Sequence, residues 1–581
     1  MPCPRLPWAC RQSTRPGVTP TLGVGSLVVG VQQSLATEPR ADVSTDVRPE
    51  KGWHHWLRPL SHLSVLVLKP FGDWVSLRRL ARWWPSWDAI LVFTAYFATR
   101  IYLLRFFTPR MSDLAGTYLG LSLHGMDCGQ IPYADFDIQY PPLAWWLIAL
   151  PRLLDPRQFT LDVLDDQAAF FALFHDYARV YRRILFLFDL AAMVLFWRLT
   201  RPRRQDTALE LASDTCSGPF AFGTAEPRRR ERRTWVRYAL GLNLTYIAAT
   251  TGLGHLLFDR LDLPLWLLLV AWASLWLSAE PQRAFCVRTA AAWIVLGLSV
   301  SFKVIPVLIV PYLLLATVLP PRQTAELASA ASQGLVPGLT QSVPRRPPWA
   351  WRPALAALIC LATGIGLPLA IQASSAGWKV FSWIPYHLER GLNVDSLWGS
   401  ILALLHQFGL PATTVNSHDA IELLSPLVPA MRLAAALSQL ALLAITLALA
   451  WRHRARFDRI AAYRTALWVL VAAVIVSNVF SPQYLIWALP LALLLAAEVL
   501  PSRVLPWLAM FGLVLGIVGL TTWLFPYHYL AESSRTALVP DLAPAACAAL
   551  GLRNAAYLAM VVLLGRAWYT SLRSSPLACK T

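Results

Sequence analysis

Long runs of apolar residues, each close to the length of a membrane-crossing helix, recur along most of this chain. A helix needs about 20 apolar residues to cross the hydrocarbon core of a bilayer. We count twelve such runs, and they predict an all-α integral membrane protein built as a bundle of about 12 transmembrane helices. The predicted spans are roughly 88–107, 181–200, 236–253, 262–279, 287–303, 304–319, 353–373, 426–450, 465–480, 483–500, 504–525 and 549–570.

Arginine is concentrated in three of the loops between these runs. Residues 201–237 carry nine Arg against five acidic residues, residues 320–352 four Arg against one Glu, and residues 452–464 five Arg against one Asp. Because cytoplasmic loops are enriched in Lys and Arg, we expect these three loops and both termini in the cytoplasm. The loops that then face outward are 108–180, 254–261, 374–425, 478–482 and 526–548.

The loop after the first predicted span is acidic. Between Thr108 and Ala178 it carries nine Asp against three Arg. It also contains the apolar run Pro141–Leu154, whose fourteen residues are too few to cross a bilayer. Its opening Pro-Pro and its two Trp residues suit a helix that lies along the membrane surface. We predict two such interfacial helices in this outer loop, over about 112–124 and 141–154.

Composition supports a membrane protein and excludes other classes. Of 581 residues, 56% are hydrophobic and 14% charged, which is too apolar for an ordinary soluble protein. Most of the net charge of +18 resides in the three Arg-rich loops, so it does not indicate nucleic-acid binding. The eight Cys residues are scattered without CxxC spacing, the outer loops lack HxH and HExxH patterns, and the pair Asp135 and Asp137 alone is a weak metal signal. We therefore predict no disulfide framework and no metal site.

The chain divides into three predicted regions. Residues 1–85 are expected to form a disordered, basic cytoplasmic region. Residues 1–50 are rich in Pro, Thr, Ser and Gly and lack the basic segment, apolar core and cleavage site of a secretory signal. Residues 86–572 form the polytopic domain, with loop 108–180 as its catalytic loop, and residues 573–581 form a short cytoplasmic tail.

Several short motifs in the predicted outer loops carry polar and aromatic residues. The motifs are Met111-Ser112-Asp113-Leu114, Pro132-Tyr133-Ala134-Asp135-Phe136, Tyr140-Pro141-Pro142-Leu143, Gly254-His255, Lys303-Val304-Ile305-Pro306, Tyr386-His387-Leu388-Glu389-Arg390-Gly391 and Ser481-Pro482-Gln483-Tyr484. With these motifs in this order, the chain resembles bacterial glycosyltransferase family 87, which comprises polyprenyl-phosphate-mannose-dependent mannosyltransferases and their relatives of the GT-C fold. The resemblance runs from about 88 to 570 and implies transfer of a sugar from a polyprenyl phosphate to an acceptor hydroxyl on the outer face, with no cofactor.

Two carboxylates of the outer loop are the catalytic candidates. A sugar hydroxyl is a poor nucleophile at neutral pH and needs a positioned base. The resemblance assigns that role to Asp113, which follows the first span; alternatively, Asp113 caps a helix that begins near Leu114. Asp135 could hold sugar hydroxyls or orient the site, or it could bond backbone amides in an Asx turn. We interpret Asp127 and Asp137 as solvated loop charges.

Cationic residues at the outer ends of the spans are candidates for binding the donor phosphate. Charge that develops on a leaving phosphate requires positively charged donors. Arg390 and His387 are three residues apart and could share a helix face. Lys303 and His255 lie in apolar surroundings, where polar residues are costly. The alternatives are that Lys303 extends to the membrane surface and that His255 bonds a backbone carbonyl.

Four further residues are candidates for binding the sugar or the acceptor: Tyr133, Tyr140, Gln483 and Asp259. Gln483 presents an amide group just outside a span, although it could also serve with its neighbour Tyr484 as an interfacial anchor. Asp259 could instead form an ion pair with the adjacent Arg260, which contributes little if exposed.

The sequence therefore predicts a multi-pass glycosyltransferase of the inner (plasma) membrane. The expected donor is a polyprenyl phosphate that carries mannose or another hexose or pentose, and the acceptor is a lipid or glycan. Both termini are expected in the cytoplasm and the active site on the outer side, with inversion at the anomeric carbon. The alternative is a transporter or flippase of a lipid-linked glycan. A transporter should place its ionisable residues mid-span with related halves, and this sequence does not.

Overall fold

The computed structural model describes residues 87–107, 112–155, 157, 163, 166–201, 225–279, 285–319, 351–417, 420–500, 503–528 and 542–573. The predicted cytoplasmic region 1–85 and, except for Arg573, the predicted tail lie outside the described residues. The chain divides into two compact units, Pro16–Phe97 and a second unit that consists of Met1–Arg15 and Ala98–Thr581. In the smaller unit, the described residues are helical, and the larger unit contains the features described below.

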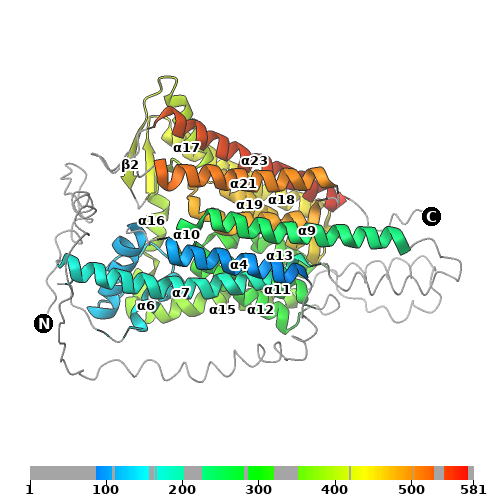
Figure 1. The fold of residues 1–581 in the computed structure, drawn as a ribbon. Coiled ribbons are helices and arrows are strands. Elements are labelled where there is room, and N and C mark those ends of the chain that lie inside the picture. Colours follow the sequence, from blue (N-terminus) through cyan, green and yellow to red (C-terminus); the bar gives the residue numbers. More distant parts are fainter. Residues whose placement is uncertain are drawn as a thin grey trace. The chain divides into compact units, whose positions relative to one another are not determined.

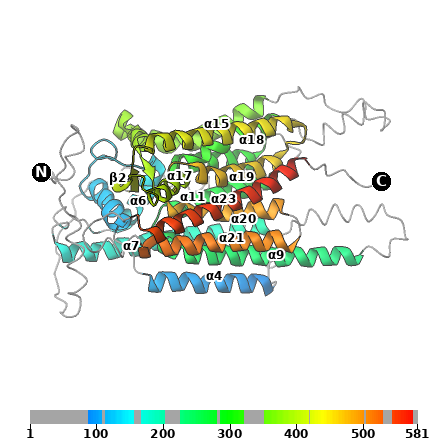
Figure 2. The same cartoon turned by 90° about the horizontal axis from the view of Figure 1, so that it is seen from above.

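Helices make up nearly all of the described larger unit, and the longest run side by side (Figures 1 and 2). Each predicted apolar run falls on a helix, which confirms the mostly helical architecture. The helices are α4 (Trp87–Phe106, shared by the two units), α7 (Gln167–Thr200), α9 (Ala225–Gly252), α11 (Asp262–Ser278), α12 (Val287–Phe302), η4 (Ile305–Ile309) with α13 (Val310–Val318), α15 (Trp351–Ala376), α18 (Val428–Arg452), α19 (Arg459–Val476), α20 (Leu485–Val499), α21 (Val504–Thr522) and α23 (Pro544–Arg573).

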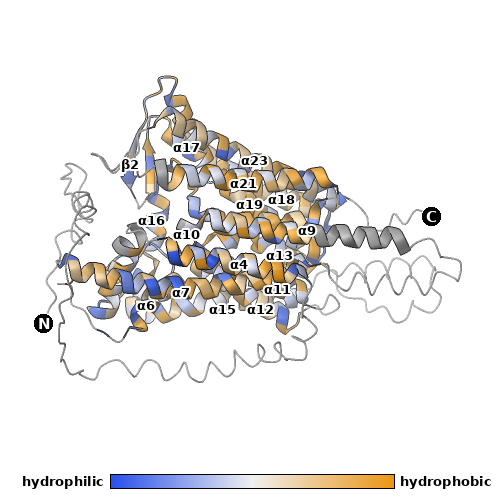
Figure 3. Ribbon diagram, in the orientation of Figure 1, coloured by the Kyte–Doolittle hydropathy of each residue, from blue (hydrophilic) through white to orange (hydrophobic). Residues whose placement is uncertain are grey.

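Seven helical segments of the described chain are long and apolar enough to cross a membrane. Large apolar side chains on their outer surfaces are exposed, for example Leu440 at 63% and Leu505 at 76%, as expected where helices face lipid (Figure 3). The protein is therefore a multi-pass membrane protein. Because α11, α12 and Ile305–Val318 are shorter, the count of about 12 spans stays a prediction. The seven segments are Trp87–Phe106, Trp351–Glu389, Val428–Arg452, Arg459–Val476, Pro482–Val499, Val504–Phe525 and Pro544–Arg573.

The core of the bundle contains α19 and α20, which pack against each other. Both helices are apolar on all sides and mostly buried, as expected for helices surrounded by other helices. Elsewhere, α12 and α15 come into backbone contact through a pair of glycines. A Cβ atom on Gly297 would lie 2.4 Å from the carbonyl oxygen of Leu361 and 2.8 Å from the Cα of Gly364. Small residues permit this close approach of membrane helices.

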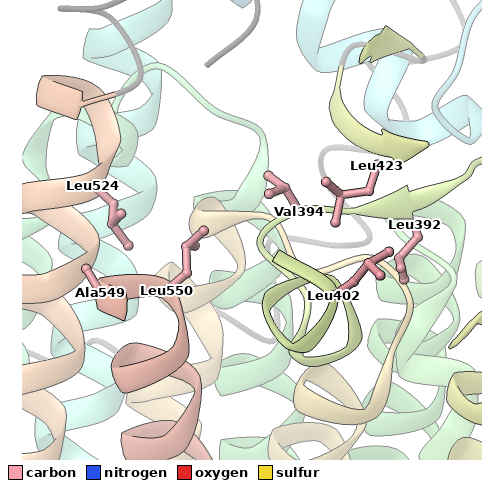
Figure 4. Packing of buried hydrophobic residues seen from close by; sticks show 7 residues of the cluster. All are labelled: Leu392, Val394, Leu402, Leu423, Leu524, Ala549 and Leu550. Carbon is pink, nitrogen blue, oxygen red and sulfur yellow. The ribbon is translucent and has the colours of Figure 1, made fainter. Parts of the chain in front are cut away.

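A small antiparallel sheet, absent from the predicted all-α fold, lies at one end of the bundle (Figure 1). Its order is β1 (Leu392–Asn393), β3 (Ala420–Leu424) and β2 (Thr413–Ser417), and Asn393 lies opposite Glu422. Strands of two to five residues give little periodic signal, which explains why the sequence did not predict them. A hydrophobic cluster joins the sheet to α17 (Leu397–His406), η9 (Trp523–His528) and α23. It contains Leu392, Val394, Leu402, Leu423, Leu524, Ala549 and Leu550 (Figure 4).

The acidic outer loop forms the two predicted short helical segments. The first runs through η1 (Ser112–Leu119), α5 (Gly120–Ser122) and η2 (Leu123–Asp127), of which η1 and η2 are π-helical, and the second is α6 (Pro142–Leu153). The interpretation of Asp127 as a solvated charge is wrong. Its side chain is 4% exposed and accepts hydrogen bonds from Arg152 Nη2 at 2.7 Å and Nε at 3.1 Å. A buried carboxylate requires such pairing, and here it holds α6 against η2.

Hydrogen bonds bring three of the predicted outer loops together at one end of the bundle. Lys379 Nζ donates to Ala134 O at 3.0 Å, which joins loops 374–425 and 108–180, and Asn478 Nδ2 donates to Gly391 O at 3.3 Å, which joins loops 478–482 and 374–425. At the other end, the indole of Trp276 in α11 donates to Arg459 O at 3.0 Å. These three outer loops therefore lie together, as predicted. Which group faces outward stays a prediction from loop charge.

A buried ion pair joins α4 to α7 inside the larger unit. Arg100 Nε donates to Asp189 Oδ2 at 2.7 Å, and both side chains are fully buried. Arg100 Nη2 also donates to Thr250 Oγ1 at 2.6 Å, and the Tyr246 hydroxyl donates to Asp189 Oδ1 at 3.1 Å. Each charge is therefore bonded to its partner and to a hydroxyl group, as buried charges require.

We expect Arg100→Met to lower the thermal unfolding midpoint of the detergent-solubilised protein strongly. It leaves the Asp189 carboxylate buried without its cation, a loss that costs about 3–5 kcal/mol in proteins. Combining it with Asp189→Leu should recover part of the stability, because no charge remains buried. Arg105→Met, at an exposed position of the same helix, is the control and should leave the midpoint nearly unchanged. Equal unfolding midpoints for Arg100→Met and Arg105→Met would contradict this account.

Candidate functional site

Lys303 lies at a break between two helices. It is the residue that follows the last turn of α12, and its backbone is extended. Pro306, in the following η4, has no backbone N–H and therefore cannot continue the hydrogen bonds of α12. The Lys303 ammonium donates to Asp262 Oδ1 at 2.6 Å and lies 4.9 Å from the ring centroid of Tyr484. With 15% of its side chain exposed, Lys303 forms a nearly buried ion pair with Asp262.

Asp262, in the first turn of α11, is a site residue that the sequence analysis missed. Its side chain is fully buried, and its Oδ1 accepts a second hydrogen bond, from Trp487 Nε1 at 3.0 Å. A lone carboxylate at the start of an otherwise apolar run was the available signal, because a charge there is costly without a partner. Its partner Lys303 is remote in sequence, so spacing could not reveal the pair.

Arg390 directly follows the short helix α16 (Trp383–Glu389). The backbone of the next residue, Gly391, is fixed by two hydrogen bonds. The amide of Gly391 donates to Glu422 Oε1 of β3 at 2.8 Å, and its carbonyl accepts from Asn478. The sheet and the loop after α19 therefore fix the backbone beside Arg390. Arg390 Nε is buried and has no hydrogen-bond partner among the residues that the structure places.

Three of the four predicted phosphate-binding residues lie close together. The positive charges of Arg390 and Lys303 both act on the His387 imidazole, which forms a hydrogen bond with the backbone of Gln139. The fourth residue, His255, is in α10 (Gly254–Leu257), which packs against η8 (Pro482–Tyr484). The His255 side chain lies outside the described part of the structure.

Tyrosine side chains lie next to this cationic group. The hydroxyls of Tyr118 and Tyr140 are 3.5 Å apart, and the Tyr118 ring centroid is 5.8 Å from that of Tyr181. Burial raises the pKa of Tyr118 well above its usual value, and the nearby Tyr140 hydroxyl raises it further, so its phenol remains neutral. Tyr133 is buried and donates its hydroxyl to Tyr140 O at 2.8 Å. Tyr133 thus supports the backbone of Tyr140.

Asp259 is bound by Arg182 of α7, a pairing that the sequence analysis did not anticipate. Arg182 Nε and Nη2 donate to the two carboxylate oxygens at 2.7 and 3.0 Å, and Nη1 donates to Phe107 O. Both side chains are at most 8% exposed. This bidentate pair fixes the base of the acidic loop against α7, so Asp259 acts in the structure as an anchor.

The two carboxylates predicted to be catalytic have different surroundings. The backbone of Asp113 lies in η1, and the i→i+5 register of a π-helix places it one turn before Tyr118. The side chain of Asp113 lies outside the described residues. Asp135 is exposed and accepts a hydrogen bond from the amide of Ile131 at 2.7 Å, so it bonds a backbone amide as in the alternative interpretation. That amide lies four residues earlier in the chain, so the contact is not an Asx turn, which bonds an amide two residues later. Gln483 is half-buried in η8, beside Tyr484.

Within the ranges that the structure describes, no group of three or more His, Cys, Asp or Glu side chains could hold a metal ion.

Comparison with known proteins leaves the family undefined. No family model and no curated protein sequence matches the chain. A solved structure of ArnT from Cupriavidus metallidurans, bound to undecaprenyl phosphate, is similar with 14% sequence identity and a TM-score of 0.36, over 83% of this chain and 77% of that chain. This likeness is too low to support an inference about the chemistry of the chain.

Proposed function

We propose that this protein is a membrane glycosyltransferase that moves a sugar from a polyprenyl phosphate to an acceptor hydroxyl on the outer face of the membrane. The observation that carries the proposal is the convergence of Lys303, His387 and Arg390 beside the Gln139–Tyr140 segment. Lys303 follows the end of α12, whereas His387 and Arg390 lie in and just after α16. The fold brings these two helix ends together at one end of the bundle. A cationic site at a helix end of a membrane protein suits a lipid phosphate, whose charge remains at the surface while its chain enters the bilayer.

The unpaired donors near Arg390 support an anionic ligand. Besides Arg390 Nε, the hydroxyl of Ser382 and the indole N–H of Trp383 are buried with no hydrogen-bond partner in the described chain. The Trp383 ring contacts that of His387, with their centroids 6.2 Å apart. Buried donors without acceptors are costly, and phosphate oxygens would satisfy them. The same contacts would stabilise the charge that develops as the phosphate leaves.

The proposed reaction is a single displacement with inversion. The acceptor hydroxyl attacks the anomeric carbon of mannose or of another hexose or pentose, while the bond from that carbon to the phosphate oxygen breaks. The acceptor proton passes to the carboxylate of Asp113, and the polyprenyl phosphate leaves with the bonding electrons. Inversion follows because the two bonds lie on opposite faces of the sugar.

Transfer of label from a synthetic donor tests the proposal. Purified protein would be mixed with radiolabelled polyprenyl phosphosugars bearing mannose, another hexose or a pentose, together with a membrane extract that supplies lipid and glycan acceptors. We expect label in a new product with at least one donor. Absence of transfer with every donor, together with translocation of a lipid-linked glycan by vesicles that contain the protein, would establish a transporter instead.

A further inference from the structure

Two fully buried polar atoms near Lys303 have no hydrogen-bond partner among the described residues. They are Oδ2 of Asp262 and the hydroxyl oxygen of Tyr181, and both side chains are 0% exposed. The first is an acceptor and the second a donor. A carboxylate oxygen buried without a donor is among the most costly groups in a folded protein, so this arrangement indicates a polar occupant between the two side chains.

The two side chains belong to helices that pack against each other, Tyr181 to α7 and Asp262 to the start of α11. Residues close to them in the chain are joined directly, because Arg182 Nη2 lies 2.7 Å from Asp259 Oδ1. The Tyr181 ring centroid is 5.8 Å from that of Tyr118. The other oxygen of Asp262 is 2.6 Å from the ammonium of Lys303. A ligand whose phosphate lies at Lys303 would therefore place its next atoms beside Asp262 and the tyrosines.

We propose that Asp262 and Tyr181 form a binding site for one ring hydroxyl of the donor sugar, an inference that rests on the proposed function. A hydroxyl group donates its hydrogen to Asp262 Oδ2 and accepts from the Tyr181 hydroxyl. Neither a second carboxylate nor an ammonium group complements both atoms.

This site makes the protein select for a hydroxyl at one position of the sugar. A site built to bond a hydroxyl discriminates against the analogue that lacks it, because its buried polar groups are then left unpaired. Both atoms that would contact the sugar hydroxyl, Asp262 Oδ2 and the Tyr181 hydroxyl, have no other partner in the described chain. Tyr181 is the one to test, because changing Asp262 would also break its ion pair with Lys303.

A binding experiment with full-length protein in detergent tests the site. The probes are undecaprenyl phosphate, undecaprenyl phosphosugars that carry mannose, glucose or arabinose, and the monodeoxy analogues of the sugar that binds tightest. We expect a sugar to improve affinity over the sugar-free lipid, and one deoxy analogue to lose most of that gain. We expect Tyr181→Phe to weaken binding of that sugar about threefold to tenfold, the effect of one neutral hydrogen bond, and to abolish discrimination against the same deoxy analogue.

Tyr177→Phe is the matched control. Tyr177 lies one turn earlier on α7, and its ring stacks on Tyr181 with centroids 6.0 Å apart. Its hydroxyl already donates to Ile148 O at 2.9 Å, so its loss should not alter discrimination between the sugars. Equal affinity of Tyr181→Phe and wild type for every probe would overturn the hydroxyl site, as would wild-type protein that binds all lipids equally well. Failure of wild type to bind even undecaprenyl phosphate would overturn the proposed function.

Discussion

Asp113→Asn is expected to reduce sugar transfer about 10²- to 10⁴-fold, because an amide cannot accept the proton of the attacking hydroxyl. The assay is transfer of radiolabel from the synthetic donor by purified protein. Donor affinity should change little, since the phosphate and the sugar are bound by other residues. The variant is nearly isosteric and should unfold at the wild-type temperature.

Asp137→Asn is the control for Asp113, because Asp137 is an exposed carboxylate of the same loop. Its transfer rate should stay close to that of wild type. If Asp113→Asn retained full activity, the base would have to be another carboxylate, and Asp135→Asn is the next variant to measure. Loss of activity in Asp137→Asn alone would place the chemistry elsewhere in the acidic loop.

Arg390→Ala is expected to lower kcat/KM for the polyprenyl phosphosugar roughly 10- to 100-fold, the effect of losing a hydrogen bond to a charged group. Its guanidinium lies beside His387 and Lys303, and its buried Nε has no partner in the described chain. Binding of the sugar-free undecaprenyl phosphate should weaken to a similar extent. Arg390→Lys should recover part of the loss, because it keeps the charge but not the two-pronged geometry.

Lys379→Ala provides the comparison for Arg390. Lys379 is an exposed cation of η6 (Gly377–Phe381), and it donates to Ala134 O at 3.0 Å. Lys379→Ala removes one positive charge from this end of the bundle, as Arg390→Ala does. If both variants lost affinity equally, a general electrostatic attraction would explain the result, and Arg390 would not contact the phosphate.

The helices and their grouping by end of the bundle could be predicted from the sequence, because hydropathy and loop charge are local signals. The run Pro141–Leu154 shows this well, since its length and Pro-Pro opening predicted the short helix α6. The proximity of Lys303, His387 and Arg390 was also suggested by their common placement at span ends.

The pairings within the site could not be predicted in the same way. Asp262 and Lys303, or Asp259 and Arg182, are brought together by helix packing and leave no spacing pattern in the chain. Asp127 appeared to be a solvated loop residue, and only the folded loop brings Arg152 to it. Whether a charged side chain is buried and paired depends on the residues that surround it, and these are set by the tertiary structure.

The backbone of Tyr133 adopts a left-handed conformation, with a φ of 70°. This conformation costs a residue other than glycine roughly 1–3 kcal/mol. The buried ring and the bond from its hydroxyl to Tyr140 hold this conformation in place. The segment that leads to α6 is therefore ordered before a ligand arrives, and little conformational entropy is lost there on association. The substrate range of the proposed glycosyltransferase should therefore depend on the fit of the sugar to this rigid segment rather than on folding of a loop around the sugar.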